Sequence, residues 1–273
     1  MGNGTPVGPG RAAALIATIG AVLAMLASTL LVAGSAAAAP PTPTPLQTCE
    51  KSGSFPLGGG VYVAANNVWG AETRQCISNS GARTDSGFVV DTAEHVNTDG
   101  PAGYPSIYRG CVYGYCTGGS PFPRRVDQLG TVTSSWTTGG PTDPASTYNT
   151  AYDLWFDPNA NQPGRNTGAE LMVWLNTTGV QPIGAKGESV TIAGASWDVW
   201  QGELDGLPVI SYVRTVGTTS VTNLPLHSFV ADATARGVVQ PAWYLTSVQA
   251  GFEPWTGGAG LRTISYSVTQ KGR

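Results

Sequence analysis

The sequence is poor in charge, in histidine and in basic clusters. Asp, Glu, Lys and Arg make up 11% of its 273 residues, and the formal net charge is −3. With no basic stripe to follow a phosphate backbone, the composition excludes a protein that binds nucleic acid or another polyanion. The two histidines, His95 and His227, lie in a turn-like and a helix-like stretch, which disfavours a histidine-based triad or a metal site. We therefore expect neither a metal nor an organic cofactor.

Long apolar runs are absent except near the start of the chain. There Arg11 precedes an apolar run over residues 12–33, and an Ala-x-Ala site follows at Ala37 and Ala39. This order is typical of a secretory signal peptide. The run is long enough for an uncleaved membrane anchor, but nothing positively charged follows it closely to hold it in place. We predict cleavage near Ala39.

The domain prediction follows from this cleavage. Residues 1–39 are expected to be the signal peptide, 40–47 a spacer rich in proline and threonine, and 48–273 one folded domain. We expect a secreted, extracellular, monomeric protein without membrane contact after cleavage. No internal repeat and no second domain are evident.

Cysteine is scarce, with four residues. In an exported chain, four cysteines indicate two disulfides, for which three pairings are possible. Only four residues separate Cys111 from Cys116, which favours a local bridge and leaves Cys49 to pair with Cys76. We expect both disulfides to be structural.

Glycine, proline and aromatic residues are abundant: 37 Gly, 20 Pro, 8 Trp and 10 Tyr. Apolar and polar residues alternate along many segments, and turn-forming residues separate these segments, which predicts an all-β sandwich of two sheets. Aromatic rings beyond the needs of a core suggest stacking surfaces for sugars, since a basic patch for nucleic acid is missing. Strands are expected at 60–64, 67–78, 87–93, 106–112, 130–137, 148–156, 168–176, 189–192, 196–201, 208–213, 245–251 and 261–270.

One segment has the period of a helix instead. Leu226, Phe229, Val230 and Ala233 follow at i, i+3, i+4 and i+7, and Gly237 can end the helix. We expect one short helix packed on the sandwich.

Three of the predicted strands carry acidic residues on one face. In "ELMVWLN", Leu171, Val173 and Leu175 form an aliphatic face that must be buried, so Glu170, Met172 and Trp174 face outward. The same alternation sends Asp153 outward in "AYDLWF" and Glu253 outward in "TSVQAGFE". Carboxylates beside tryptophan and methionine are unusual on a merely solvated face.

Paired carboxylates among aromatic residues suit glycoside hydrolysis. One carboxylate must be ionised to attack the anomeric carbon, and the other must hold a proton for the leaving oxygen. Because Glu253 lies between Phe252 and Trp255, apolar burial should raise its pKa, which makes it the better acid; Glu170 is the better nucleophile. The alternative from another class is a non-catalytic glucan-binding sandwich whose carboxylates bind sugar hydroxyls.

At these residues the sequence resembles the glycoside hydrolase family 12 endoglucanases. The resemblance covers about residues 48–270, and its motifs are "NNVWG" (66–70), "YPSIYRGCVYGYC" (104–116), "AYDLWFDP" (151–158), "ELMVWLN" (170–176), "QPIG" (181–184) and "WYLTSVQAGFEPW" (243–255). It implies a β-jelly roll of two stacked antiparallel sheets, with an open cleft on the concave sheet. It also implies retaining hydrolysis of β-1,4-glucans through a covalent glycosyl-enzyme.

The resemblance also assigns roles to individual residues. It implies Glu170 as nucleophile and Glu253 as acid/base, with Asp153 and Met172 in support. Trp69 matches a tryptophan on which a glucosyl unit stacks. The other expected substrate-binding residues are Asn67, Tyr108, Tyr113, Trp174, Gln249, Trp255 and Pro182.

The expected function is that of a secreted endo-β-1,4-glucanase. The loops bordering the cleft are not diagnostic, so a xyloglucan-specific endoglucanase on the same catalytic pair remains the alternative. Since no carbohydrate-binding module is evident in the sequence, soluble or amorphous glucan is favoured over crystalline cellulose.

Overall fold

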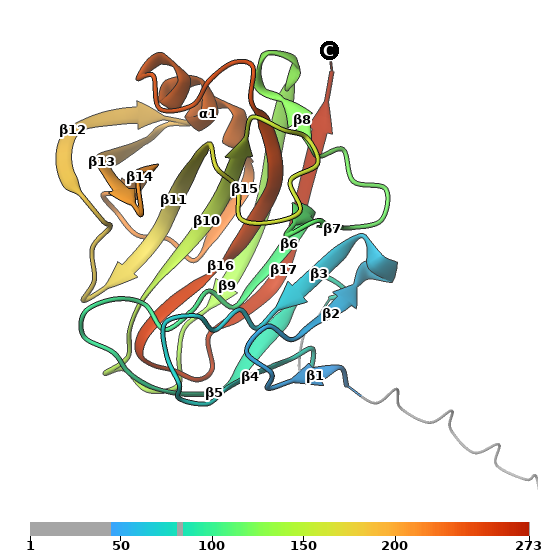
Figure 1. Ribbon diagram of the computed structural model, residues 1–273. Helices are drawn as coiled ribbons and strands as arrows, with labels where there is room; N and C mark the ends of the chain where they lie inside the picture. Colours follow the sequence, from blue (N-terminus) through green and yellow to red (C-terminus); the bar gives the residue numbers. More distant parts are fainter. Residues whose placement is uncertain (1–44, 81–83, 273) are drawn as a thin grey trace, which may run out of the picture. The chain divides into compact units, whose positions relative to one another are not determined.

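Two layers of strands make up the part of the chain that the computed structural model describes, residues 45–80 and 84–272 (Figure 1). The predicted signal peptide and most of the predicted spacer lie outside these residues. The first sheet contains, in spatial order, β1 (Gln47–Thr48), β4 (Gln75–Ser78), β5 (Phe88–Val96), β17 (Arg262–Lys271), β9 (Thr131–Gly139) and β15 (Ser220–Pro225).

The second sheet carries all three acidic residues singled out in the sequence. Its spatial order is β2 (Ser54–Leu57), β3 (Tyr62–Ala65), β6 (Ser106–Val112), β16 (Tyr244–Gly258), β10 (Thr147–Asp157), β11 (Ala169–Thr178), β14 (Leu207–Arg214), β13 (Ala195–Leu204) and β12 (Ala185–Ile192). The short strands β7 (Tyr115–Cys116) and β8 (Arg124–Arg125) pair with β6 and β16, and two 3-10 turns cover Gly58–Gly60 and Val126–Gln128. Figure 1 shows that the long strands of this sheet are strongly curved.

Pairing in both sheets is antiparallel with one exception among the described strands. β14 runs parallel to β11, since the β12–β13 hairpin lies between them in sequence. The predicted antiparallel sheets thus contain one parallel pair of strands.

A strand predicted over residues 67–78 is mostly absent. Asn67 has φ of 44°, a left-handed conformation that an extended strand does not accept. The segment instead contacts the turn around Gly103 through an isolated antiparallel β-bridge between Val68 and Gly103. A Cβ atom on Gly103 would lie 2.4 Å from the carbonyl oxygen of Asn67, so only glycine fits there. The strands β1, β2, β7, β8 and β15 were not predicted.

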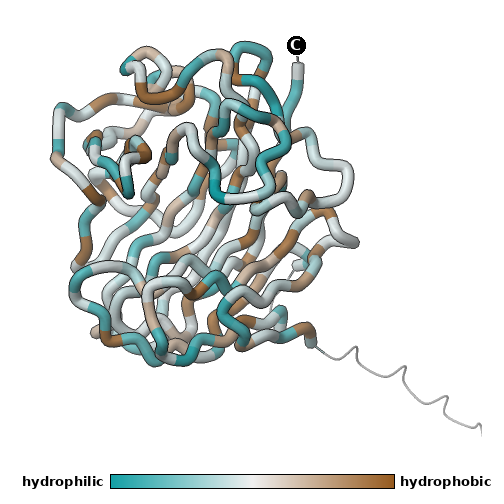
Figure 2. Tube along the Cα trace, viewed as in Figure 1, coloured by the Kyte–Doolittle hydropathy of each residue, from teal (hydrophilic) through white to brown (hydrophobic). Residues whose placement is uncertain are grey.

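The main hydrophobic core lies between the two layers. Trp136 of β9 packs edge-on against Tyr152 of β10 with ring centroids 5.0 Å apart, and against Phe252 of β16 at 5.9 Å. Leu171 and Val173 of β11 belong to this core, as the alternation predicted. Figure 2 shows hydrophobic and hydrophilic residues interspersed along the strands, which is the pattern expected for sheets with one buried face.

The predicted helix is present as α1 (Leu226–Ala235), and its four apolar residues are buried. Phe229 contacts the rings of Trp197 and Tyr212 at 4.9 and 5.2 Å. Gly237 follows the helix with φ of 77°, which confirms its expected place at the C-terminal end. Within the described residues, no helix is long and apolar enough to cross a membrane.

Both predicted disulfides are present. Cys49 bonds to Cys76 and ties the first described strand to β4, while Cys111 bonds to Cys116 across the β6–β7 hairpin. All four cysteines are thus paired.

Candidate active site

Three acidic side chains lie on the face of the second sheet that points away from the main core, called here the carboxylate face. β10 lies between β11 and β16, so its register relates all three. Asp153 pairs with Met172 on one side and Gln249 on the other. Two residues further along β10, Trp155 pairs with Glu170. In the opposite direction, Asn149 pairs with Glu253. The glutamates therefore lie on either side of Asp153.

Glu253 is held by the asparagine across the strand pair. Asn149 Nδ2 donates a hydrogen bond to Oε2 of Glu253, and the backbone N–H of Glu253 donates to Asn149 Oδ1 at 3.2 Å. Phe252 points into the main core and is fully buried, as strand alternation predicts, so its ring does not desolvate the carboxyl. Burial still raises the pKa of Glu253, to about 7, and the Asn149 amide lowers it in part.

Glu170 is the more buried of the two glutamates, with 7% of its surface exposed. Burial and then the charge of Glu253 raise its pKa, Arg165 in the preceding loop lowers it in part, and the net result is a pKa of about 8. The two pKa values thus stand in the opposite order to the one used to assign roles from the sequence. Part of the shift of Glu170 disappears once Glu253 is protonated, because the charge of Glu253 is one of its causes.

Asp153 lies between the glutamates and is also buried. Trp155 Nε1 donates to Asp153 Oδ2 at 2.5 Å. Burial, and then the charge of Glu170, raise the pKa of Asp153 well above its usual value, while the indole hydrogen bond lowers it. Three neighbouring carboxyl groups that all disfavour ionisation must share protons near neutral pH.

Met172 and Trp174 form a small apolar cluster beside the acids. The indole Nε1 of Trp174 lies 3.4 Å from Sδ of Met172. Ala151 completes the buried set, and the side chains of Val180 and Val213 pack against it. The cluster gives the carboxylate face an apolar floor next to its polar groups.

Trp69 and Asn67 lie in the segment between β3 and β4. Trp69 is 57% exposed, as a stacking ring must be. The segment is anchored from below: Asn66 Nδ2 donates to the carbonyl oxygens of Glu50 and Gln75, at 2.9 and 3.0 Å. His95 Nε2 hydrogen-bonds Gln75 Oε1 at 2.9 Å and extends this network. A rigid network thus supports the exposed indole.

The other predicted substrate-binding residues are not all accessible. Tyr108 and Gln249 share the row of Asp153 but are largely buried. Tyr113, at the tip of the β6–β7 hairpin, is 60% exposed. Trp255 is partly buried. Pro182 is buried between β11 and β12, whereas its neighbours Gln181 and Ile183 are exposed.

Sequence reasoning missed Asn149, Ser106 and Ser211 on this face. Asn149 contacts Glu253 directly and shares a face with Asp153, so alternation carried two steps further would have found it. Among the described residues, several buried polar atoms lack a partner, including Oγ of Ser106, Oγ of Ser211 and Oδ1 of Asp153. All three belong to the carboxylate face by register. Unpaired polar atoms gathered on one face indicate where a ligand supplies the missing hydrogen bonds.

No metal site accompanies these groups in residues 45–80 and 84–272: no set of three or more His, Cys, Asp or Glu side chains there could hold a metal ion.

Comparison with known proteins gives consistent matches. Residues 60–270 match Glycosyl hydrolase family 12. The structure superimposes on the endoglucanase Cel12A from Rhodothermus marinus with a TM-score of 0.78 and 44% identity, covering 84% of this chain and 100% of that chain. This match confirms the predicted all-β jelly roll. In sequence, the chain is 32% identical over 151 residues to the probable cellulase Cel12b of Mycobacterium tuberculosis, covering 55% of this chain and 97% of that protein. It is 30% identical over 231 residues to a probable xyloglucan-specific endo-β-1,4-glucanase A of Aspergillus terreus, covering 81% and 86%.

Proposed function

The chain belongs to glycosyl hydrolase family 12 and is an endo-β-1,4-glucanase, and we propose that it is secreted and cleaves internal β-1,4-glucosidic bonds by double displacement with retention of configuration. The observation that carries the proposal is the register of β11, β10 and β16, in which Glu170, Asp153 and Glu253 share one face of the second sheet.

In the first step, Glu170 attacks the anomeric carbon while Glu253 gives its proton to the departing glycosidic oxygen. A covalent glycosyl-enzyme forms and the reducing-end fragment leaves as an alcohol. In the second step, Glu253 takes a proton from water, whose oxygen attacks the anomeric carbon and releases Glu170 as a carboxylate. Two inversions give net retention.

The protonation of the three carboxyl groups on this face supports this division of roles. The raised pKa values of the three carboxyl groups mean that the face holds protons near neutral pH. A single negative charge on Glu170, with Glu253 and Asp153 protonated, gives a nucleophile and an acid together. The assignment of Glu170 as nucleophile rests on its strand position and on the family motif, and not on the order of the two glutamate pKa values.

Residues around the acids would bind the glucan chain. The exposed ring of Trp69 suits stacking on the apolar face of a glucosyl unit, and Asn67 lies beside it for a hydroxyl contact. Met172 and Trp174 would lie beneath the sugar at the scissile bond.

A xyloglucan-specific endoglucanase is the second candidate. The observation that favours it is the identity to a relative with that description, which is close to the identity to the probable cellulase. Both candidates use the same catalytic pair, so they differ only in which glucans fit.

The test compares Glu170→Gln and Glu253→Gln with Glu203→Gln, a matched change of an exposed glutamate on β13. Reducing ends released from carboxymethyl cellulose, mixed-linkage β-glucan and xyloglucan are measured. We expect the first two variants to lose activity by about 100-fold or more on every substrate while remaining folded, and the control to match wild type. Turnover near wild type in either variant would contradict the assignment.

Secretion and oligomeric state need separate measurements. The mature protein recovered from the medium of a secreting host should begin near Pro40 and should elute as a monomer in size-exclusion chromatography. Retention of the full chain in the cell membrane would contradict the signal-peptide prediction.

A further inference from the structure

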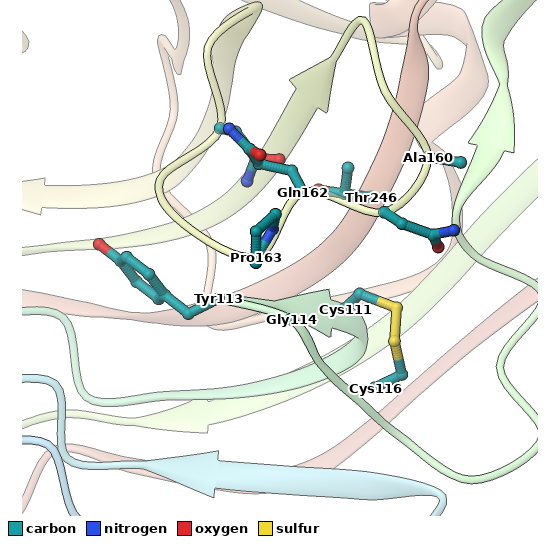
Figure 3. Close-up of a pocket in the computed structure, with 10 residues that line it drawn as sticks. Cys111, Tyr113, Gly114, Cys116, Ala160, Gln162, Pro163 and Thr246 are labelled. Carbon is teal, nitrogen blue, oxygen red and sulfur yellow. A yellow bond between two sulfur atoms is a disulfide. The ribbon is translucent and has the colours of Figure 1, made fainter.

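A pocket of about 290 Å³ lies between the β6–β7 hairpin and the loop that joins β10 to β11. Figure 3 shows the Cys111–Cys116 disulfide on one side and Gln162 on the other, with Thr246 of β16 between them. The pocket contains none of the three acidic residues described above.

The walls of the pocket are fixed by the hairpin. The disulfide closes the hairpin at its base, and Gly110 N–H donates to Thr117 Oγ1 at 3.1 Å. At the hairpin tip, a Cβ atom on Gly114 would lie 3.3 Å from Cα of Pro163, so the two walls touch there. A pocket with rigid walls loses little conformational freedom when a ligand binds.

The lining is uncharged and combines polar with apolar groups. No Asp, Glu, Lys, Arg or His lines it. Tyr113 supplies an exposed aromatic ring, and Asn161 and Asn166 supply amides. Within the described residues, the side chains of these two asparagines make no hydrogen bond, so both amides are available to a ligand. An aromatic ring with free amides and no charge fits a neutral polyhydroxylated ring.

The position of the pocket excludes the backbone sugar at the scissile bond. Along β16, Thr246 lines the pocket, and Ser247 comes next, level with Glu170 across the sheet. Gln249 follows, level with Asp153, and Glu253 lies furthest from the pocket. The pocket therefore lies beyond the row of Glu170, on the side away from Glu253. A glucan backbone that passes between the two glutamates leaves the pocket beside it. Only a group attached to the edge of that backbone would enter.

We propose that this pocket binds a neutral sugar branch carried by the β-1,4-glucan backbone, and that it makes branched glucan a preferred substrate. The inference rests on the proposed function, which it deepens. Asn161 and Asn166 donate to and accept from branch hydroxyls, and Tyr113 packs on the branch ring.

The test uses the double variant Asn161→Ala/Asn166→Ala and the pocket-filling variant Ala160→Trp. Asn159→Ala is the matched control, since Asn159 is an exposed asparagine of the same loop outside the pocket. kcat/KM is measured on xyloglucan and on unbranched mixed-linkage β-glucan. We expect both pocket variants to lose about fivefold to tenfold on xyloglucan and to stay within about twofold of wild type on the unbranched glucan. The control should match wild type on both.

Equal losses on the two glucans, or no loss on xyloglucan, would overturn the inference, as would a wild-type enzyme that cleaves only the unbranched glucan. Failure of wild type on every β-glucan would instead overturn the proposed function. In that case titration calorimetry still tests the inference, because it measures binding of an oligosaccharide and needs no turnover. Wild type should bind a xylosylated cello-oligosaccharide more tightly than the unbranched one of equal backbone length, and the double variant should lose this preference. Equal affinity of wild type for both oligosaccharides would overturn it.

Discussion

Trp155 donates a 2.5 Å hydrogen bond from its indole Nε1 to Oδ2 of Asp153. The other oxygen, Oδ1, is buried without a partner among the described residues. Burial and the charge of Glu170 raise the pKa of Asp153 well above its usual value, which favours the neutral carboxylic acid over the carboxylate. Since Oδ2 accepts from the indole, we expect the proton on Oδ1, and we expect Asp153 to donate it to the carboxylate of Glu170 during the reaction.

If Asp153 acts as a neutral donor, an amide can replace it. We expect Asp153→Asn to stay within about tenfold of wild-type kcat, because its carbonyl can accept from Trp155 while its NH₂ donates. Asp153→Leu should lose about 100-fold, the cost of removing a hydrogen bond to a charged group. Steady-state kinetics with pH profiles from 4 to 8 checks this. Equal losses in both variants would mean that the charge of Asp153, and not a donated proton, is required.

The raised pKa of Glu170 makes wild-type stability fall as pH rises. The pKa is about 8 in the folded protein against an ordinary 4.5, so the folded state resists ionisation. No penalty exists below pH ~4, and it grows as the pH rises from about 4.5 to 8. We expect Glu170→Gln to gain at least ~2 kcal/mol relative to wild type between pH 4.5 and pH 8, or about 5 °C in Tm. Thermal unfolding at the two pH values measures the difference, and a Tm gap that does not change with pH would contradict it.

The alkaline limit of activity should belong to Glu253. Its pKa is raised to about 7 by burial, and hydrolysis of glucan requires its proton, so kcat/KM should fall above pH ~7. Glu253→Ala should lose about 100- to 10,000-fold on glucan but much less on a dinitrophenyl β-cellobioside, whose leaving group needs no proton. With that substrate the alkaline limb of kcat/KM should vanish in the variant. Parallel losses on both substrates would exclude Glu253 as the acid.

The two disulfides should differ in their contribution to stability. Cys49 and Cys76 are 27 residues apart, whereas Cys111 and Cys116 are 5 apart. From the loop-closure entropy of the unfolded chain, replacing the first pair by alanine should cost about 3.5 kcal/mol and replacing the second about 2 kcal/mol. Denaturant unfolding of both double variants tests the order. A larger loss for the 111–116 pair would show that this disulfide acts through folded-state contacts with the neighbouring loop.

Much of the carboxylate face could be predicted because alternation in a strand fixes the face of each side chain. Leu171 and Val173 face the core and Glu170 faces away for this reason alone. The strand around Asn67 could not be predicted, since its positive φ depends on a turn packed beside it from far along the chain.

The order of the glutamate pKa values was also beyond the sequence. It depends on burial by neighbouring strands and on the distance to other charges, neither of which strand alternation gives. Local pattern thus gives the face of a residue, whereas the electrostatics of the face depend on its assembled neighbours.

Trapping the covalent intermediate tests the division of roles most directly. A 2-deoxy-2-fluoro-β-cellobioside with a good leaving group forms the glycosyl-enzyme and then hydrolyses slowly, so peptide mapping by mass spectrometry can locate the attached sugar. We predict attachment at Glu170 in the peptide that contains "ELMVWLN". Attachment at Glu253 or Asp153 would contradict this assignment. So would an enzyme that is not inactivated and that releases a sugar of inverted anomeric configuration.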